Sequence, residues 1–545
     1  MHFKTDQVIN LNSDNASAKG RPVLPGNHWT KTKPMRNVRS VLLVLLGLAA
    51  CVQVKAQKVI TTFPANLSRE VNPDTRLILT FPGNFKLHNK GQIRIYDASN
   101  DELVDMLDMS IPPGPRNTRT PAPYDSMVYN SYGDKMYSVK EPDTSSAHIY
   151  QKNYIGGNLE SDAFHFYPVI VRGNSAIICP HNNKLKYNKV YYVRIGPDVF
   201  SSDEGTFNGF KGKKDWVFTT KVQAPSLVAE SYVVSADGQG DFSTVQAAVD
   251  FIPEVNPKRK IIRIKNGVYD EIVYFRNKEN ITFAGEDREK VIVNYANNGV
   301  FNTRLMSADP ALSKGSHSLR AVFAVHNSNG IHLSNLTLRS LGEKPAQAEA
   351  LLVIGKKIIV NNVNIEGSGD ALQATGTIYV KDSKIQGFGD NVLGYGAVFF
   401  DKCDFVSTFG PHLWVRNTQA NHGNVLLNCT LRTIGDVETT IARAPNSNGF
   451  SYPFVEAVLI DCKLEGIVPE GWGKVADVTK DIRYWEYNST TLDGKPVDIS
   501  KRHPASRQLD LEKDAKLIEN YRNPAYILDG WMPDIPQSLS QYLRK

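Results

Sequence analysis

The stretch IYVKDSKIQGFGDNVLGYGAVFFDKCDF, residues 378–405, contains one eight-residue frame twice, at 378–385 and at 398–405. In each copy, three apolar residues precede two polar residues, and a small side chain occupies the sixth position. β-Branched and aromatic residues favour strands, but a unit of 20 residues is too short to bury its own apolar face. The stretch therefore indicates a solenoid whose successive coils cover one another.

The same frame fits six segments of the chain's second half. They are IHLSNLTL, IIVNNVNI, IYVKDSKI, VFFDKCDF, NVLLNCTL and AVLIDCKL, with Leu336, Val363, Ser383, Cys403, Cys429 and Cys462 at the sixth position. Strands joined by turns, without long helices, favour a parallel β-helix over a leucine-rich repeat. We expect the three cysteines to stack as small buried thiols and to form no disulfide with one another.

Two acidic turns, GSGD and GFGD, end at Asp370 and Asp390. Each aspartate lies seven residues past the sixth frame position, so we expect adjacent coils to hold them about 4.8 Å apart along the stack. Two carboxylates this close have pKa values that are driven apart. Asp436 also lies seven residues past Cys429. Spacing alone therefore leaves catalysis, calcium binding and turn structure open.

Length and composition limit the class of protein. At 545 residues the chain is expected to form more than one folding unit, and 41% apolar with 22% charged residues is typical of a globular protein. The net charge of +7 is diffuse, and no basic stripe is interleaved with aromatic residues. We therefore expect no nucleic-acid partner, whereas a mild positive charge suits a polyanionic substrate.

Residues 1–56 are expected to be an N-terminal extension and a secretory signal. Arg36 and Arg39 precede an apolar run, 41–52, that is short for a membrane span. Cleavage before Gln57 predicts a secreted or periplasmic protein, whereas a lipobox ending at Cys51 predicts an outer-membrane lipoprotein. No later segment is expected to cross a membrane.

Residues 57–221 are rich in short strands separated by turns. We predict them at 75–81, 91–97, 165–171, 175–180, 189–195 and 215–220, with a long insertion at 106–160. The order of the strands resembles bacterial Ig-like modules, which implies a β-sandwich. We expect it to act as a spacer or docking module without chemistry.

A linker at 222–231 leads to the second domain, 232–545, with its C-terminal tail. Near its start, Ser243 and Gln246 match a capping box, and Val245, Ala248, Val249 and Ile252 form one apolar stripe. This predicts a short helix that closes the open end of the stack. The predicted fold class is all-β, with a parallel β-helix after the sandwich.

The motifs of this second domain, taken in order, resemble those of the pectinesterase (pectin methylesterase) family over about residues 232–500. They are DGQGDFSTVQAAVD, QAEAL, GSGDALQ, GFGDNVLG, IARAP and IVPEGWG. The resemblance implies a right-handed parallel β-helix that hydrolyses methyl esters of homogalacturonan in pectin, without a cofactor or metal. We expect a monomer.

The resemblance also implies roles for individual residues. Asp390 is the nucleophile, and Asp370 is the general acid and later the general base. Arg443 orients Asp390 as an anion, and the amide of Gln347 stabilises the tetrahedral oxyanion.

The chain departs from the family pattern at two places. Gly369 replaces the glutamine that precedes the general acid, and Ala444 and Pro445 stand where the family has Pro-Trp. One oxyanion donor is therefore missing, unless Gln373, three residues after Asp370, reaches the site from another angle. Trp414 and Trp472 are candidates for stacking on a sugar, with ordinary packing as the alternative for each.

Two other functions stay open. One is a calcium-dependent pectate lyase, in which stacked aspartates bridge metal to uronate carboxylates. The other is a β-helix that binds pectin without turnover, which the missing Gln and Trp suggest.

Overall fold

The computed structural model describes residues 59–114, 150–157, 162–299, 301–302, 319–342, 347–446, 451–475 and 478–535. The predicted export signal with Cys51 and most of the insertion at 106–160 lie outside these residues. Among the described residues, no helix has the length and apolar character to span a membrane.

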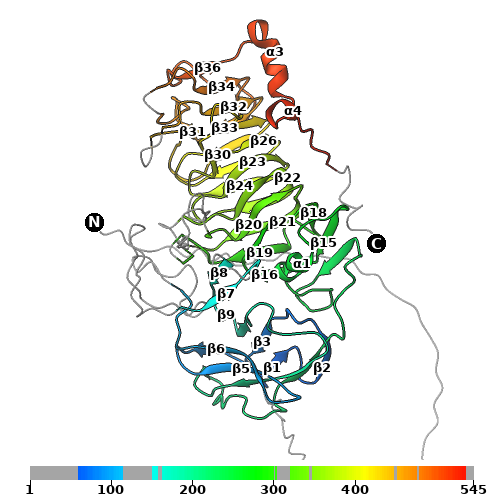
Figure 1. The fold of residues 1–545 in the computed structure, drawn as a ribbon. Helices are drawn as coiled ribbons and strands as arrows, with labels where there is room; N and C mark the ends of the chain where they lie inside the picture. The colour runs from blue at the N-terminus through cyan, green and yellow to red at the C-terminus, as the bar shows by residue number, and fades with distance from the viewer. Residues whose placement is uncertain are drawn as a thin grey trace, which may run out of the picture. The chain divides into compact units, whose positions relative to one another are not determined.

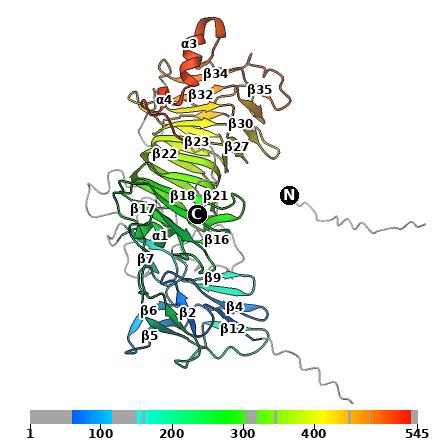
Figure 2. The same ribbon diagram turned by 90° about the vertical axis from the view of Figure 1, so that its right-hand side faces the viewer.

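One large sheet runs from β14 to β36, and its paired strands are parallel throughout the stack (Figures 1 and 2). Its first half consists of β14 (Ser231–Val234), β15 (Lys260–Ile264), β16 (Gly267–Asp270), β17 (Val273–Arg276), β18 (Ile281–Gly285), β19 (Val291–Tyr295), β20 (Phe323–Asn329), β21 (His332–Ser340), β22 (Leu351–Glu366), β23 (Leu372–Lys381) and β24 (Lys384–Gly387). Its second half consists of β25 (Val392–Gly394), β26 (Ala397–Asp401), β27 (Asp404–Ser407), β28 (Leu413–Val415), β29 (Asn424–Leu427), β30 (Thr430–Thr433), β31 (Ala442–Arg443), β32 (Glu456–Ile460), β33 (Lys463–Glu465), β34 (Arg483–Tyr487), β35 (Thr490–Thr491) and β36 (Ser506–Gln508).

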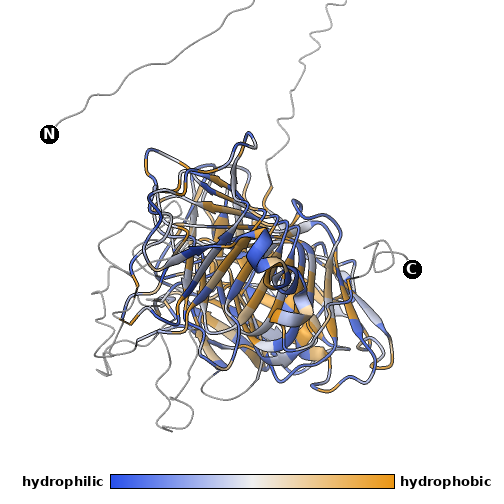
Figure 3. Ribbon diagram, turned by 90° about the horizontal axis from the view of Figure 1, so that it is seen from above, coloured by the Kyte–Doolittle hydropathy of each residue, from blue (hydrophilic) through white to orange (hydrophobic). Residues whose placement is uncertain are grey.

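The register of these strands confirms the repeat. Leu336 pairs with Val363, and the residues that follow the sixth frame position pair from coil to coil, as Lys384 does with Asp404. Apolar side chains of successive coils are buried inside the stack, and Figure 3 shows hydrophobic colour concentrated in the strands. The predicted all-β fold class with a parallel β-helix is confirmed.

A column of left-handed backbone conformations explains why Asn and Asp recur in the frame. The residue before each sixth position has φ between 47° and 60°. These residues are Asn335, Asn362, Asp382, Lys402, Asn428 and Asp461. Asn and Asp tolerate this region better than other residues that carry a Cβ. The repeat therefore encodes the turn as well as the buried face.

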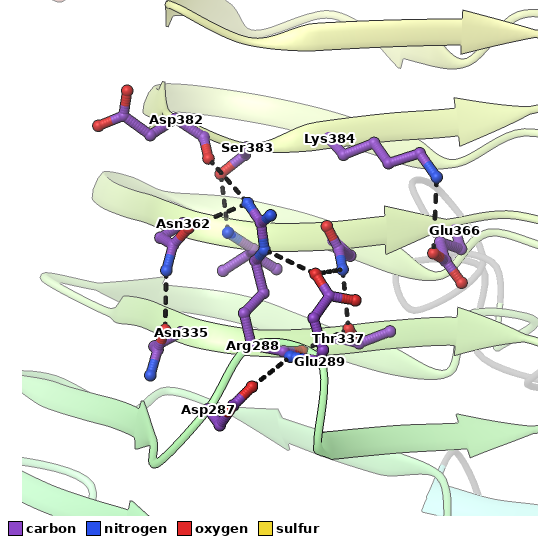
Figure 4. A network of polar contacts seen from close by, with 12 residues as sticks. Asp287, Arg288, Glu289, Asn335, Thr337, Asn362, Glu366, Asp382, Ser383 and Lys384 are labelled. Atoms are coloured by element: carbon purple, nitrogen blue, oxygen red, sulfur yellow. Dashed lines mark hydrogen bonds and ion pairs between the residues drawn. The ribbon is translucent and has the colours of Figure 1, made fainter. Parts of the chain in front are cut away.

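Side chains also link the coils along this column. The Asn362 amide donates to Asn335 Oδ1 over 2.7 Å, and Arg288 Nη1 donates to Asn362 Oδ1 over 3.0 Å (Figure 4). Inside the stack, Cys403, Cys429 and Cys462 are buried free thiols, and the Cys403 N–H donates to Cys429 Sγ over 3.4 Å. The cysteines thus pack as small residues of one ladder.

Helix α1 (Val245–Phe251) precedes the first full coil. Its predicted apolar stripe, from Val245 to Ile252, is buried as expected. The predicted capping box is wrong by one residue, because Thr244 is the N-cap and accepts from the Ala247 N–H. Gln246 is instead buried and both accepts from and donates to the backbone of Tyr274, which ties the helix to β17.

The first part of the described chain forms mainly antiparallel sheets, with one parallel pair of strands, 68–71 with 217–220. One contains β1 (Thr61–Phe63), β3 (Leu77–Thr80), β10 (Ser175–Ile178) and β9 (Val169–Arg172), and another contains β2 (Ser68–Val71), β13 (Val217–Thr220), β11 (Val190–Ile195), β5 (Gln92–Asp97) and β6 (Leu103–Asp108). Two further two-stranded sheets pair β4 (Phe85–Leu87) with β12 (Phe200–Ser202) and β7 (Lys152–Tyr154) with β8 (Ala163–His165). A strand lies within each of the predicted ranges, but the range 165–171 is divided between the end of β8 and β9, with no strand at 166–168. The Ig-like character stays a prediction.

Asp74 joins these sheets to the β-helix. Its Oδ2 accepts from the N–H groups of Ser243 and Thr244 over 2.8 and 2.7 Å, and from the Thr244 hydroxyl over 2.9 Å. The Glu271 carboxylate accepts from the next two N–H groups of α1. The free N–H groups at the start of α1 are therefore satisfied by carboxylates.

The described chain ends in two helices, α3 (Leu511–Tyr521) and α4 (Pro524–Ile527). Tyr521, Ile527 and Leu528 pack against outward-facing aromatic and aliphatic residues of the sheet, including Tyr379 and Phe399. These helices cover one outer face of the later coils.

Candidate active site

Three carboxylates occupy equivalent positions on three successive coils. Leu351 of β22 pairs with Leu372 of β23, and Leu372 pairs with Val392 of β25. Glu349, Asp370 and Asp390 each lie two residues before one of these paired residues. We call the three side chains the carboxylate column. The predicted stacking of Asp370 on Asp390 is thus extended by one coil.

Glycines allow the acidic turns to pack closely. A Cβ on Gly389 would lie 2.5 Å from Gly410 Cα, and a Cβ on Gly367 would lie 2.0 Å from the Asp370 carbonyl oxygen. Asp390 itself has a left-handed φ of 48°. Non-glycine residues in this region are common at functional sites, where the surrounding structure holds them.

Arg443 of β31 binds Asp390 through both nitrogens of its fork. Nε donates to Oδ1 over 2.8 Å, and Nη2 donates to Oδ2. Arg443 pairs in register with Trp414 of β28, and its guanidinium carbon lies 4.5 Å from the centroid of that indole. Arg416 lies over the same ring at 3.5 Å. The carboxylate, arginine and indole thus form one stacked group, which holds Asp390 in place.

Arg320, just before β20, binds the opposite end of the column. Its Nε donates to Glu349 Oε2 over 2.5 Å, and its Nη2 donates to Glu349 Oε1. The same Nη2 lies 3.4 Å from Asp370 Oδ2. Glu349 is fully buried and the Arg320 side chain is 14% exposed. An arginine therefore binds each outer carboxylate through two bonds, whereas the middle one receives a single long contact.

Asp370 is the carboxyl group that this arrangement keeps protonated. Burial is the largest effect, and the negative charges of Glu349 and Asp390 add to it, so that the pKa of Asp370 rises to about 8. Arg320 and Arg416 oppose this rise. At neutral pH, Asp370 can therefore donate a proton beside an arginine-bound Asp390 anion.

Gln347 is also brought to this end of the site. Its side-chain Oε1 accepts from Arg320 Nη1. Since a guanidinium can only donate, the amide must turn its oxygen towards Arg320 and its NH₂ group away. Gln347 is exposed, and its NH₂ is thus presented as a donor.

The remaining predicted site residues differ in their placement. Gln373 of β23 faces the same side of the sheet as Trp414, since both pair with Leu393, and its Oε1 is buried without a partner among the described residues. Trp472 is only 2% exposed and stacks on Tyr484 with ring centroids 4.6 Å apart. Trp472 therefore packs inside the protein. This favours the packing alternative and does not support stacking of Trp472 on a sugar. Asp436 lies in an exposed loop.

Two functional candidates were missed from sequence. Glu349 is the third residue of the QAEAL segment, and only its spacing of 21 residues from Asp370 could have indicated that it lies in the same column. Phe409, 58% exposed, stacks on Phe388 of the GFGD turn with centroids 4.9 Å apart. This pair, one ring exposed and the other half-buried, lies beside Asp390 and offers an aromatic surface on which a sugar ring could stack.

Comparison with known proteins agrees with this geometry. The family model described as Pectinesterase matches residues 231–515, which is more than half of the chain. The chain belongs to the pectinesterase family. The match begins at β14 and ends in α3, so it covers the whole β-helix and none of the antiparallel sheets before it.

Curated pectinesterases are similar over the same region. Pectinesterase 4 of Arabidopsis thaliana is 29% identical over 282 residues, covering 48% of this chain and 45% of that protein. Pectinesterase QRT1 of the same plant is 27% identical over 360 residues, covering 62% of this chain and 89% of that protein. The match thus spans about half the length of the first relative and most of the second. Among solved structures, carrot pectin methylesterase is 23% identical with a TM-score of 0.47, covering 58% of this chain and 99% of that chain.

Proposed function

We propose that this pectinesterase family member removes methyl esters from homogalacturonan in pectin, with Asp390 as nucleophile and Asp370 as acid and base. The observation that carries the proposal is the adjacent pair of carboxyl groups in two different electrostatic states. Asp390 is bound by the Arg443 fork, whereas the pKa of Asp370 is raised to about 8. One group can attack and the other can protonate a leaving group at the same pH.

In the first step, an Asp390 oxygen forms a bond to the ester carbonyl carbon. The carbonyl oxygen becomes an oxyanion, and the NH₂ of Gln347 is the candidate donor to it. The C–OCH₃ bond then breaks, and the Asp370 proton moves to the departing oxygen. Methanol leaves, and the galacturonyl group remains joined to Asp390 as an anhydride.

In the second step, the Asp370 carboxylate takes a proton from water. The hydroxide attacks the carbonyl carbon, and the bond to Asp390 breaks. The product is a galacturonate carboxyl, and Asp390 is again an anion held by Arg443. Asp370 is protonated again, so both groups return to their starting states.

We propose that exposed aromatic rings near the catalytic turn bind the sugar chain in place of the missing family tryptophan. Phe409 is the first candidate, and Tyr395, which is 45% exposed just after β25, is the second. Trp414 has two guanidinium groups over its ring, so we assign it to the support of Arg443. The net charge of +7 suits the anionic product.

For the complete protein, we propose export from the cell and action on pectin as a monomer. The support is the apolar run at 41–52 behind Arg36 and Arg39. A single chain also carries all the proposed catalytic residues.

Methanol release from highly methylated pectin tests the function, with EDTA present and with Asp390→Asn as the inactive variant. We expect methanol from the wild type and a loss of at least 10³-fold in the variant. Unsaturated products that EDTA abolishes would instead indicate a lyase. Pectin binding with no methanol above the Asp390→Asn background would indicate a binding protein.

A further inference from the structure

The Arg320–Glu349 pair has no role in the reaction steps described above. It is nevertheless buried directly against Asp370, since Glu349 is on the preceding coil and Arg320 Nη2 lies 3.4 Å from Asp370 Oδ2. Burying two charges costs several kcal/mol for each ion before their attraction compensates. An apolar pair would fill this part of a β-helix at lower cost, so the charges call for a specific use.

We propose that Glu349 and Arg320 are positioning residues of the esterase site, which set the protonation of Asp370 and aim the Gln347 amide at the substrate oxyanion. The inference rests on the proposed function. It assigns to this chain a device that acts through Asp370 and Gln347 and does not itself touch the reacting atoms.

The first part of the proposal follows from which charges face Asp370. Glu349 and Asp390 lie on the coils on either side of it, Arg320 lies before β20, and Arg416 follows β28. Arg443 is bound to Asp390 and also senses the charge of Asp370. Glu349 is the strongest of these charges on Asp370. Arg320 binds Glu349 through two hydrogen bonds, and its positive charge partly offsets the effect of Glu349 on Asp370.

The second part follows from the geometry of one guanidinium. Arg320 donates from Nε and Nη2 to Glu349, and from Nη1 to Gln347. The planar fork fixes these directions relative to each other. Glu349 holds the fork, and the fork holds the amide oxygen of Gln347. The chain lacks the second family glutamine, at Gly369, so the orientation of the remaining amide matters more here.

The first experiment measures the pH dependence of kcat/KM for Glu349→Gln. Loss of the negative charge lowers the pKa of Asp370, so the basic limb moves to lower pH by about one to two units. Glu486→Gln is the matched control. Glu486 is also fully buried, and Arg502 binds it through two bonds of 3.0 Å, but it lies on β34, several coils beyond the strands that follow Asp370 and Asp390. If Glu349 has only a structural role, Glu349→Gln lowers kcat/KM equally at every pH and leaves the basic limb where it is in wild type. We expect this result for the control Glu486→Gln.

The double variant Glu349→Leu/Arg320→Met separates charge from orientation, and it removes the risk of an unpaired buried ion. Glu349 raises the pKa of Asp370 more than Arg320 lowers it, so we expect the basic limb to move to lower pH, but by less than in Glu349→Gln. Gln347 has lost its partner, so kcat stays at least tenfold lower, with KM little changed.

An infrared titration reads the same effect without turnover. The C=O stretching band of the protonated Asp370 carboxyl is identified by its absence in Asp370→Asn. The pH at which this band loses half of its intensity, its midpoint, is then compared between wild type and Glu349→Gln. If the wild type releases no methanol, the proposed function is wrong. The titration of the Asp370 band still shows whether Glu349 and Arg320 control the protonation of Asp370. Equal midpoints in the two proteins, or a double variant with wild-type kcat, would overturn the inference.

Discussion

His412 is expected to contribute to the pH dependence of this protein's stability, and its replacement by leucine should remove that contribution. The imidazole lies just before β28, fully buried inside the stack, and neither ring nitrogen has a partner among the described residues. Its main chain belongs to the ladder, since its carbonyl accepts from the Val392 N–H over 3.0 Å. A leucine keeps that backbone bond and removes the two unpaired polar atoms.

The magnitude follows from the pKa. Burial lowers the pKa of His412 to about 3, whereas the unfolded chain titrates near 6.5. Below pH 6.5 the unfolded state therefore binds a proton that the folded state refuses, and stability falls as pH falls. The loss is about 1.4 kcal/mol per pH unit down to the folded pKa. At pH 7.5 the ring is neutral in both states, and only the unpaired nitrogens, at about 1–3 kcal/mol, favour leucine.

Urea unfolding of wild type and His412→Leu at pH 7.5, 6.5, 5.5 and 4.5 measures this difference. We expect the variant to be at least as stable at pH 7.5 and its advantage to grow by about 2–3 kcal/mol by pH 4.5. His332, whose pKa is also lowered to about 3, is present in both proteins, so its contribution cancels. A difference that stays constant across this range would show that the ring is solvated or bonded in the folded state, and the reasoning would fail.

Three further predictions concern the site and the turns. Arg443→Lys keeps the charge beside Asp390 but loses one of two bonds, so kcat/KM in the methanol assay should fall about 10- to 100-fold, and an unchanged value would contradict the role of the fork. Because Asp370 must be protonated to release methanol, kcat/KM should fall about tenfold per pH unit above about 8, and a flat profile to pH 10 would exclude it as the acid. Lys402→Asn should raise the free energy of unfolding, measured in urea, by about 1 kcal/mol, because lysine is poorly suited to the left-handed φ of 55° at this position. Lys381→Asn, outside the column of left-handed residues, should not raise it.

Most of the β-helix could be predicted because its repeat is local. Each frame carries its own buried positions and its own left-handed turn, so Leu336 and Val363 could be aligned before any pairing was known. The pairing of Asp370 with Asp390 followed from the same alignment. Asp436 broke the rule because the loop after β30 is longer, and the register places Thr440 at the equivalent position.

The rest of the site depends on contacts that spacing does not encode. Arg320 lies far from Asp370 in the chain, and one arginine among many gives no sign of which carboxylate it will meet. Trp472 is next to a motif that resembles the family, yet its ring turns inward onto Tyr484. The N-cap at Thr244 is held by Asp74, which lies far away in the chain, in the turn between β2 and β3. Side-chain direction and long-range partners therefore required the structure.

Asp370 and Asp390, the proposed acid and nucleophile, each lie two residues before one of two paired strands of the ladder, so the peptide backbone sets their separation. The distance between the two side chains cannot increase gradually with temperature, because such a movement must first break main-chain hydrogen bonds of the stack. We would therefore expect the proposed esterase activity to keep its full rate until the sheet melts, and the activity and the circular dichroism signal to be lost together. Insertion of one extra coil between Asp370 and Asp390 would abolish the proposed activity and leave the β-helix folded.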